Sequence, residues 1–353
     1  MFGRKNNAML GLDISTSMIK LLELGQKKGK HTVVSYATEV LPDEAVIDGK
    51  IVDLEVVVNA LKRAIKQSGT KVKEVAIAIP TSVAVIKTLS FPLGLSEREV
   101  EEQVMLEAEN YIPYPIEDVM LDFEVIGVSD DDDSSVDVLL VATQSEYISI
   151  LSDVAEDAGL KLKLVDVSVY AMENTYHVLA QDLPNHGQGL TVALVDIGAS
   201  TTTLNVLVDG KSVFSREHAF GGRILTEEIA QQYGMSHQEA EKAKKENKFP
   251  ESYESELLTP FKQTMTTTVT RALQFFFSAS TQYQSIDHII LAGGCASIKG
   301  IAAMIEENTD TVTSVANPFG NMVITGKAKN TTLANDSPSL LTASGLALRG
   351  GSS

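Results

Sequence analysis

The sequence contains a single cysteine, Cys295, and no long apolar run. One cysteine excludes an intramolecular disulfide framework, and the six scattered histidines include no pair at zinc-site spacing. No 18 apolar residues run uninterrupted, and the apolar stretch after the basic N-terminus is broken by Asp13. The sequence therefore predicts neither a membrane span nor a signal peptide, and we expect a cytoplasmic protein without direct membrane insertion.

Basic residues are also scarce. The chain has 29 Lys and Arg against 47 Asp and Glu, a formal net charge of -18. Nucleic-acid binding depends on cationic patches that neutralise phosphates, so we expect no nucleic-acid partner. With 44% hydrophobic residues in 353, the chain has the composition of a globular protein and the length of two domains or one large two-lobed domain.

Apolar runs rich in Val, Ile and Leu alternate with stretches of helical period. The runs predict strands at 8–14, 19–24, 31–37, 75–79, 83–89, 121–128, 136–142, 190–197, 203–208, 212–219 and 288–292. The helical stretches predict helices at 53–67, 96–111, 145–158, 167–181, 222–232, 236–246, 254–283, 298–307 and 338–348. This mixed alternation indicates an α/β protein built from layered sheets and helices.

The chain resembles itself at one place. Residues 9–24 read MLGLDISTSMIKLLEL and residues 193–207 read ALVDIGASTTTLNVL, so that Asp13 aligns with Asp196. Each stretch continues through a polar turn into another predicted strand. This repeat predicts two similar halves, each opening with strand, acidic turn and strand.

The two acidic turns, DISTS from Asp13 and DIGAST from Asp196, carry the chemistry. Small side chains let backbone N–H groups point at an anion, hydroxyls add donors, and an aspartate offers hard oxygen to Mg²⁺. Lys20, one short strand beyond the first turn, is placed to reach a β- or γ-phosphate. Two facing turns would hold a polyphosphate and its metal, although either turn alone is also typical of a simple hairpin.

A third stretch, IILAGGCASIKG at 289–300, places two glycines between an apolar strand and a helix. This geometry allows a flat ligand to approach the backbone closely, and a tight strand-to-helix connection is the alternative. Cys295 is interpreted as a small core residue. The sequence has no G-x-G-x-x-G, P-loop or G-x-S-x-G motif, which argues against other nucleotide folds and against triad hydrolases.

In order and spacing, these three stretches resemble the first phosphate, second phosphate and adenosine motifs of the actin, sugar-kinase and heat-shock-chaperone superfamily. Helices 167–181 and 338–348 look like its two connecting helices. The resemblance covers nearly the whole chain and implies an actin-like, ribonuclease H-like α/β fold of two lobes with the nucleotide between them.

Residues 91–127 (FPLGLSEREVEEQVMLEAENYIPYPIEDVMLDFEVIG) and 315–322 (VANPFGNM) resemble more specifically the PilM family of type IV pilus assembly, a relative of FtsA. Ser96 and Glu99 form a capping box for the helix there. The implied organisation is a first-lobe core at 1–90 and 165–190, an FtsA/PilM-type insert at 91–164 and a second lobe at 191–353, which holds a helical subdomain at 221–285 and a connecting helix at 338–350.

The resemblance implies ATP and Mg²⁺ as cofactors, with Asp13 and Asp196 organising the metal. Carried over residue by residue, it assigns nucleotide binding to Asp13, Ser15, Thr16, Ser17, Lys20, Asp196, Gly198, Ser200, Thr201, Gly222, Thr226, Glu241, Lys244, Gly293, Gly294 and Ser297.

Two departures matter. Ser15 stands where relatives usually have glycine, and a positive φ would be costly for serine. Ala199 stands where actin has a further aspartate that helps to position the attacking water, so no catalytic residue is assigned and at most a slow ATPase is expected. Asp166 is interpreted as the N-cap of helix 167–181, with orientation of water as the alternative.

The resemblance also implies partners. By this resemblance the chain is expected to dock the N-terminal cytoplasmic peptide of the inner-membrane protein PilN in a groove between insert and first lobe, and to link it to the pilus motor ATPases. The protein would thus lie in the cytoplasm, peripheral to the inner membrane. A filament-forming, FtsA-like cell-division ATPase and a small-molecule kinase of the same superfamily are the alternatives.

Overall fold

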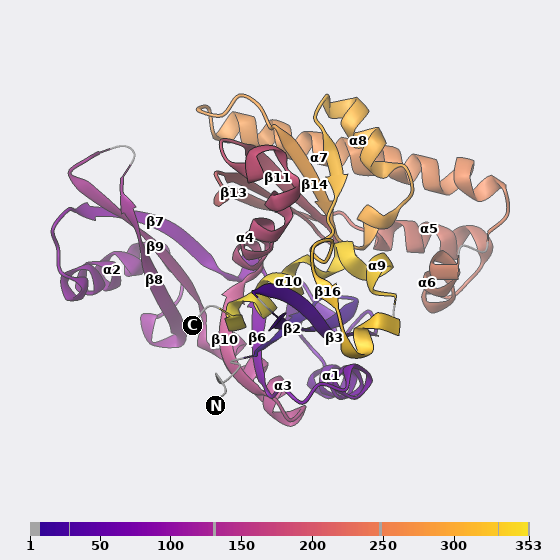
Figure 1. The fold of residues 1–353 in the computed structure, drawn as a ribbon, viewed down its shortest axis with the longest axis horizontal. Coiled ribbons are helices and arrows are strands. Elements are labelled where there is room, and N and C mark those ends of the chain that lie inside the picture. Colours follow the sequence, from indigo (N-terminus) through magenta and orange to yellow (C-terminus); the bar gives the residue numbers. More distant parts are fainter. Residues whose placement is uncertain (1–7, 28, 130–131, 247–248, 331, 352–353) are drawn as a thin grey trace.

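Two sheets of the same internal strand order form the two halves of the molecule. The computed structural model describes residues 8–27, 29–129, 132–246, 249–330 and 332–351. The first sheet has the order β10-β6-β1-β2-β3-β16 and the second β13-β12-β11-β14-β15 (Figure 1). We call these the first and second lobes.

The strands of the first lobe are β1 (Leu10–Ile14), β2 (Met18–Lys27), β3 (Lys30–Val40), β6 (Glu74–Ile79), β10 (Lys161–Val167) and β16 (Val323–Ile324), with a small hairpin of β4 (Val46–Ile47) and β5 (Lys50–Ile51). Those of the second lobe are β11 (Thr191–Ile197), β12 (Thr202–Val208), β13 (Lys211–His218), β14 (His288–Ala292) and β15 (Thr313–Val315). Both sheets join an antiparallel meander to parallel strands.

The internal repeat is visible in the strand register. Asp13 pairs with Lys20 across the β1–β2 hairpin, and Asp196 pairs with Thr203 across the β11–β12 hairpin. Both aspartates are the next-to-last residue of their strand, and both partners lie seven residues further on. The prediction of two halves that open in the same way is therefore confirmed.

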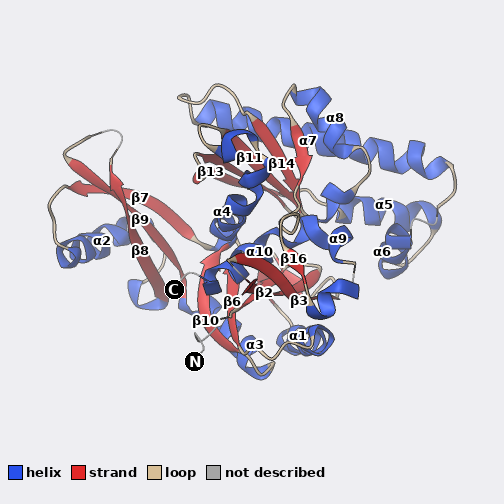
Figure 2. Ribbon diagram, in the orientation of Figure 1, coloured by secondary structure: helices blue, strands red, loops and turns tan. Residues whose placement is uncertain are grey.

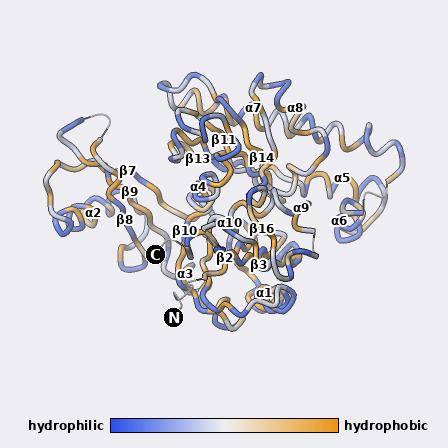
Figure 3. The backbone as a smooth tube through the Cα atoms, viewed as in Figure 1, coloured by the Kyte–Doolittle hydropathy of each residue, from blue (hydrophilic) through white to orange (hydrophobic). Residues whose placement is uncertain are grey.

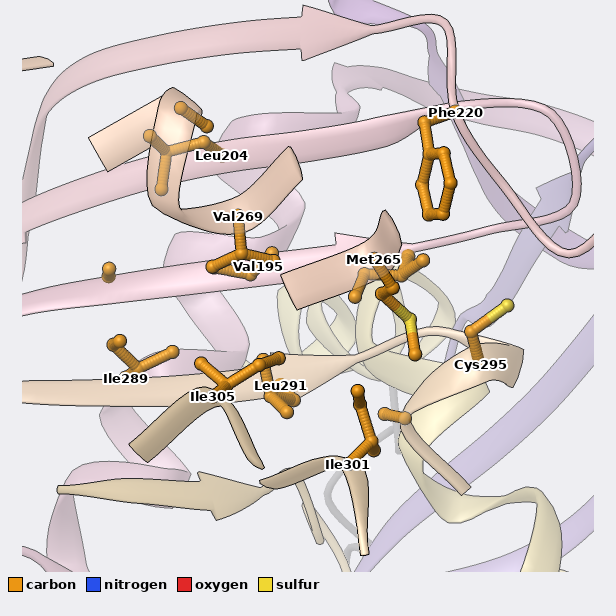
Figure 4. Close-up of a cluster of buried hydrophobic side chains, with 14 of the residues drawn as sticks. Val195, Leu204, Phe220, Met265, Val269, Ile289, Leu291, Cys295, Ile301 and Ile305 are labelled. Carbon is orange, nitrogen blue, oxygen red and sulfur yellow. The ribbon is translucent and has the colours of Figure 1, made fainter. Parts of the chain in front are cut away.

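Helices cover the outer face of each sheet (Figure 2). In the first lobe α1 (Leu54–Ser68) and α3 (Ser145–Asp157) form one core with β1, β2 and β6. In the second, α5 (Arg223–Tyr233), α7 (Thr259–Ala279) and α8 (Ile301–Thr309) enclose a core of similar size. Figure 4 shows this core, in which Cys295 lies among apolar side chains, as expected from the sequence.

Two helices lie between the lobes. α4 (Ser168–Leu179) packs on the second sheet and α10 (Leu341–Leu348) on the first, and the two helices contact each other. The contact is close because Gly345 has no side chain: a Cβ there would lie 1.7 Å from the carbonyl oxygen of Ala171. Gly11 allows the same closeness between β1 and α10, since its Cβ would lie 2.0 Å from the oxygen of Ala343. These two helices match the expected connecting helices.

The insert is a separate three-stranded sheet, β7 (Val85–Pro92), β9 (Ser135–Gln144) and β8 (Val119–Val128), with α2 (Glu97–Tyr111) on one face. The Ser96–Glu99 capping box is present, and α2 ends before Pro113 as predicted. The tube in Figure 3 has hydrophilic stretches along α2.

The structure places one expected part of the insert elsewhere. Residues 145–157 form α3, whose apolar face packs into the first-lobe core, and residues 161–167 form β10, which pairs in parallel with β6. From the sequence we predict no strand at 161–167. The inserted sheet and its helix thus occupy about residues 85–144.

Other differences are local. The predicted helix 254–283 begins with a π-helical turn, Glu254–Leu258, and its α-helical part ends at Ala279. Asp166 is not an N-cap: it is the next-to-last residue of β10, and Val167 precedes α4 without a side-chain cap. The Asp166 carboxylate lies 3.7 Å from Arg349 and is otherwise buried, so that burial raises its pKa.

Candidate functional site

The first acidic turn holds a buried ion pair. Asp13 and Lys20 face each other in the β1–β2 register, and the Lys20 Nζ donates to Oδ2 of Asp13 over 2.8 Å. Their side chains are only 16% and 13% exposed. The lysine is thus fixed beside the aspartate by the hairpin itself.

The second acidic turn brings Asp196 to the same place. Burial raises the pKa of Asp196 to about 6; Lys20 opposes this rise and Asp13 adds to it. Burial alone would lower the pKa of Lys20, but attraction to Asp13 and Asp196 outweighs it, and the net pKa is raised. The charges of two carboxylates from opposite lobes therefore act on one ammonium group, which is bonded to Asp13, and the three formal charges sum to -1.

Hydroxyl groups join the two turns directly. The Thr16 Oγ1 of the first turn lies 3.4 Å from the Ser200 Oγ of the second. The first turn is closed by Ser15, whose N–H and hydroxyl both donate to the carbonyl of Met18. Ser15 does not have a positive φ, so serine is accommodated without the strain that its replacement of glycine suggested. Ser17 accepts a bond from the N–H of Leu41 through its carbonyl oxygen.

The second turn rests on a pair of glycines at the start of α5. The Gly198 N–H donates to the carbonyl of Thr201, and the Gly198 carbonyl in turn accepts from the N–H of Gly222. A Cβ on Gly221 would lie 2.4 Å from the oxygen of Ala199. We named Gly222 from the sequence and missed Gly221, although the adjacent glycines are a visible signal of close backbone approach.

Thr226, Glu241 and Lys244 form one polar network. The Lys244 Nζ donates to Thr226 Oγ1 over 2.6 Å, to Glu241 Oε1 over 2.8 Å and to the carbonyl of Gly222 over 3.2 Å. Thr226 is fully buried and also bonds Glu241. The network holds α6 (His237–Glu246) against the start of α5, beside the second turn.

The third predicted stretch abuts the second turn. β14 ends beside Asp196, and Gly293 follows with φ of +82°, where a Cβ would lie 2.4 Å from the Asp196 Oδ1. Gly294 begins a short 3-10 helix and has open space around it. Ser297 lines a cavity of about 660 Å³, with the rest of its wall from Ala296, Ile298, Lys299, Gly300, Ala302, Ala303, Val315, Ala334, Asn335 and Pro338.

Cys295 is a structural residue of this junction. Its thiol lies 3.6 Å from the carbonyl oxygen of Gly198, is 7% exposed and has its pKa raised to about 11 by burial. A thiol of this kind is a poor nucleophile near neutral pH.

The two aspartates suit a magnesium ion whose remaining coordination positions are filled by phosphate oxygens and waters. Within the described residues no group of three or more His, Cys, Asp or Glu could hold a metal by itself. Mg²⁺ is usually held by one or two carboxylates together with phosphate oxygens and waters, and Asp13 and Asp196 provide two. The net negative charge of the cluster and the raised pKa of Asp196 both favour a cation there.

One inter-lobe contact was not expected from the sequence. Asp43, just after β3, lies 3.2 Å from Arg223 at the start of α5 and 2.9 Å from His237 at the start of α6. Pro42 and Asp43 are typical of a turn, and no motif indicated that this turn reaches the other lobe.

Comparison with known proteins identifies the family. The family model described as "Type IV pilus assembly protein PilM" matches residues 11–351. This chain belongs to the PilM family. The sequence-based resemblance is thereby confirmed, and type IV pilus assembly is the process in which the family takes part.

The relatives agree with the fold. A solved structure titled "PilM-PilN type IV pilus biogenesis complex" superimposes with a TM-score of 0.80 at 24% identity, covering 97% of this chain and 98% of the other. The ethanolamine utilization protein EutJ of Carboxydothermus hydrogenoformans has a TM-score of 0.57 at 17% identity, covering 96% of this chain and 89% of EutJ. FtsA of Bacillus subtilis is 23% identical, over 89% of this chain and 79% of FtsA. This PilM-family chain therefore has the actin-like fold.

Among the described residues, none of the helices combines the length and apolar character needed to cross a bilayer.

Proposed function

We propose that this PilM-family protein binds a single Mg²⁺–ATP between its lobes and docks the N-terminal cytoplasmic peptide of PilN on its insert. It would thus work in the cytoplasm at the inner membrane. The observation that carries the nucleotide part is the shared ion cluster, in which Lys20 bonds Asp13 and is also attracted by Asp196 of the other lobe.

Each part of the cluster has a role suited to a nucleotide. Lys20 supplies a fixed positive charge for the phosphates, and the hydroxyls of Thr16 and Ser200 supply donors from opposite sides. Asp13 and Asp196 would hold the magnesium ion, which when bound neutralises the phosphate charge. Gly293 lets the chain pass close to Asp196, and the open space around Gly294 leaves room for the nucleoside beside the second turn.

Turnover is expected to be slow. Hydrolysis needs a group that orients or deprotonates the attacking water, and the second turn has Ala199 where actin has an aspartate. The binding of nucleotide would then favour one relation of the two lobes rather than drive synthesis. A steady phosphate release far below that of a sugar kinase, unchanged by added sugars, is the expected result.

Calorimetric titration with ATP and Mg²⁺ tests the site. Asp196→Ala should weaken binding at least tenfold, because it removes half of the carboxylate pair. Asp153→Ala, an exposed aspartate on α3, is the control and should bind as the unaltered protein does. Equal affinity of Asp196→Ala and the control would refute the assignment.

The docking part is supported by the edge of the insert. β8 pairs with β9 and, in the described part of the chain, with no other strand, so its outer backbone groups are open to an added strand. β8 contacts α3 of the first lobe. Several large apolar side chains on β8 are about half exposed: Met120, Val125, Ile126 and Val128.

An extended peptide would bond the backbone of β8 and cover these side chains. The PilN segment is the proposed occupant because the chain belongs to the PilM family and superimposes on a PilM-PilN complex. From this position the protein would link PilN to the motor ATPases of the pilus.

A binding titration with a labelled PilN N-terminal peptide tests the docking. Met120→Glu places a charge on the open strand and should weaken peptide binding at least tenfold. Val213→Glu is the matched control, since Val213 is a similarly exposed apolar residue on β13 of the second lobe. If Met120→Glu and Val213→Glu bind the peptide equally well, docking on β8 is wrong.

A further inference from the structure

We propose that Asp43 is a positioning residue that holds the two phosphate-binding turns at their working separation by bridging the lobes to Arg223 and His237. The inference rests on the proposed nucleotide site but concerns residues outside it. Oδ1 of Asp43 lies 3.2 Å from the Arg223 guanidinium, and Oδ2 lies 2.9 Å from Nδ1 of His237. One carboxylate thus contacts two helices of the other lobe.

Both ends of this bridge are tied directly to the turns. On the first-lobe side, the N–H of Leu41, two residues before Asp43, donates to the carbonyl of Ser17 over 2.8 Å. On the second-lobe side, the N–H of Arg223 itself donates to the carbonyl of Ala199, also over 2.8 Å. A change in the separation of the turns is therefore transmitted to Asp43 and Arg223 through one backbone hydrogen bond on each side.

The His237 contact adds the helix that lines the site. His237 is the first residue of α6, and α6 carries Glu241 and Lys244, which bond Thr226 and the carbonyl of Gly222. Asp43 therefore holds the start of α5 directly and the start of α6 through its histidine.

The contacts of Asp43 with Arg223 and His237 are weak enough to break and re-form. The side chains of Asp43, Arg223 and His237 are 43%, 29% and 29% exposed, and polar contacts of this exposure contribute modestly to the free energy of folding. Together the two contacts are expected to shift the balance between joined and separated turns by about three- to tenfold. Such a bridge makes release of a ligand held by both turns slower without preventing it.

Two measurements on the full-length protein test the proposal. The first is the distance distribution between spin labels on exposed positions Asn59 of α1 and Gln231 of α5, taken without nucleotide. Cys295 can stay in place, because burial and its raised pKa make it label slowly. The second is the dissociation rate of a fluorescent ADP from the unlabelled protein.

Asp43→Asn should broaden the label distances toward longer values and speed ADP release about three- to tenfold. Arg223→Met should act in the same direction, and the double variant should be little worse than the more severe single variant, since both changes remove the same contact. Glu39→Gln is the matched control: Glu39 is on β3 and pairs with Arg63 over 3.1 Å, but both residues belong to the first lobe. It should leave both measurements unchanged.

The outcomes distinguish a failure of the Asp43 bridge from a failure of the proposed nucleotide site. Unchanged distances in Asp43→Asn, or equal changes in Glu39→Gln, would overturn the bridge. Altered distances in Asp43→Asn with no ADP binding even by the unaltered protein would support the bridge between the lobes and overturn the proposed nucleotide function. A thermal unfolding curve of each variant shows that the lobes themselves remain folded.

Discussion

Replacing Asp196 by asparagine should stabilise the nucleotide-free protein while weakening its affinity for nucleotide at least tenfold. Burial and the neighbouring Asp13 raise the pKa of Asp196 from 3.8 to about 6, against the opposing effect of Lys20. A shift of about two units corresponds to about 3 kcal/mol between the protonated and charged forms. Because the side chain is partly exposed, we expect about 1–3 kcal/mol.

The sign of the effect depends on pH. A carboxyl group whose pKa is higher in the folded state binds its proton more tightly there, so the folded state is favoured below pH 4 and loses this advantage as pH rises through about 6. Asparagine does not titrate. The stability difference between Asp196→Asn and the unaltered protein should therefore grow between pH 4 and 6 and be complete above about pH 7.

Chemical denaturation of the nucleotide-free proteins at pH 4.5 and 8 measures this difference. Asp13→Asn provides a control of opposite sign, because it leaves the 13% exposed Lys20 without the negative charge of its 2.8 Å partner and should cost about 1–3 kcal/mol at pH 8. Were Asp196→Asn no more stable than the unaltered protein at pH 8, or were the difference the same at both pH values, the account of this buried cluster would fail.

Two further predictions concern packing. Gly345→Ala should lower the thermal midpoint by the equivalent of about 3 kcal/mol or more, because its Cβ would meet the oxygen of Ala171 at 1.7 Å. Gly294→Ala, whose Cβ would meet nothing within 4 Å, should leave the midpoint unchanged. Equal effects of the two substitutions would contradict the packing between α4 and α10. Cys295 should react with a thiol reagent at pH 8 far more slowly in the folded than in the denatured protein, because burial raises its pKa to about 11, and equal rates would show that the second-lobe junction is open.

The two acidic turns could be predicted from sequence because the same pattern of residues occurs twice in the chain. Asp13 and Asp196 each follow a buried run and each precede small or hydroxylic residues, and a local pattern that occurs twice determines the local geometry twice. The capping box of α2 was predictable because it is local: Ser96 and Glu99 bond each other within one helical turn.

What escaped prediction depends on long-range packing. β10 has alternating lysines and leucines, and only its pairing with β6 makes it a strand of the first lobe and not part of the insert. The contact of Asp43 with Arg223 joins positions 180 residues apart. Arg223 lies between the assigned Gly222 and Thr226, but no motif contains Asp43. The role of Gly221 could not be predicted, because glycine is required there by the carbonyl of Ala199, which belongs to a separate turn. The sequence shows only two adjacent glycines.

The most direct measurement is the affinity of Asp13→Asn and Asp196→Asn for ATP and Mg²⁺, determined by calorimetry beside the unaltered protein. We expect one nucleotide bound per chain and a loss of at least tenfold in affinity for each variant, although one variant is destabilised and the other stabilised. Full affinity in either variant would contradict a nucleotide held jointly by the two lobes.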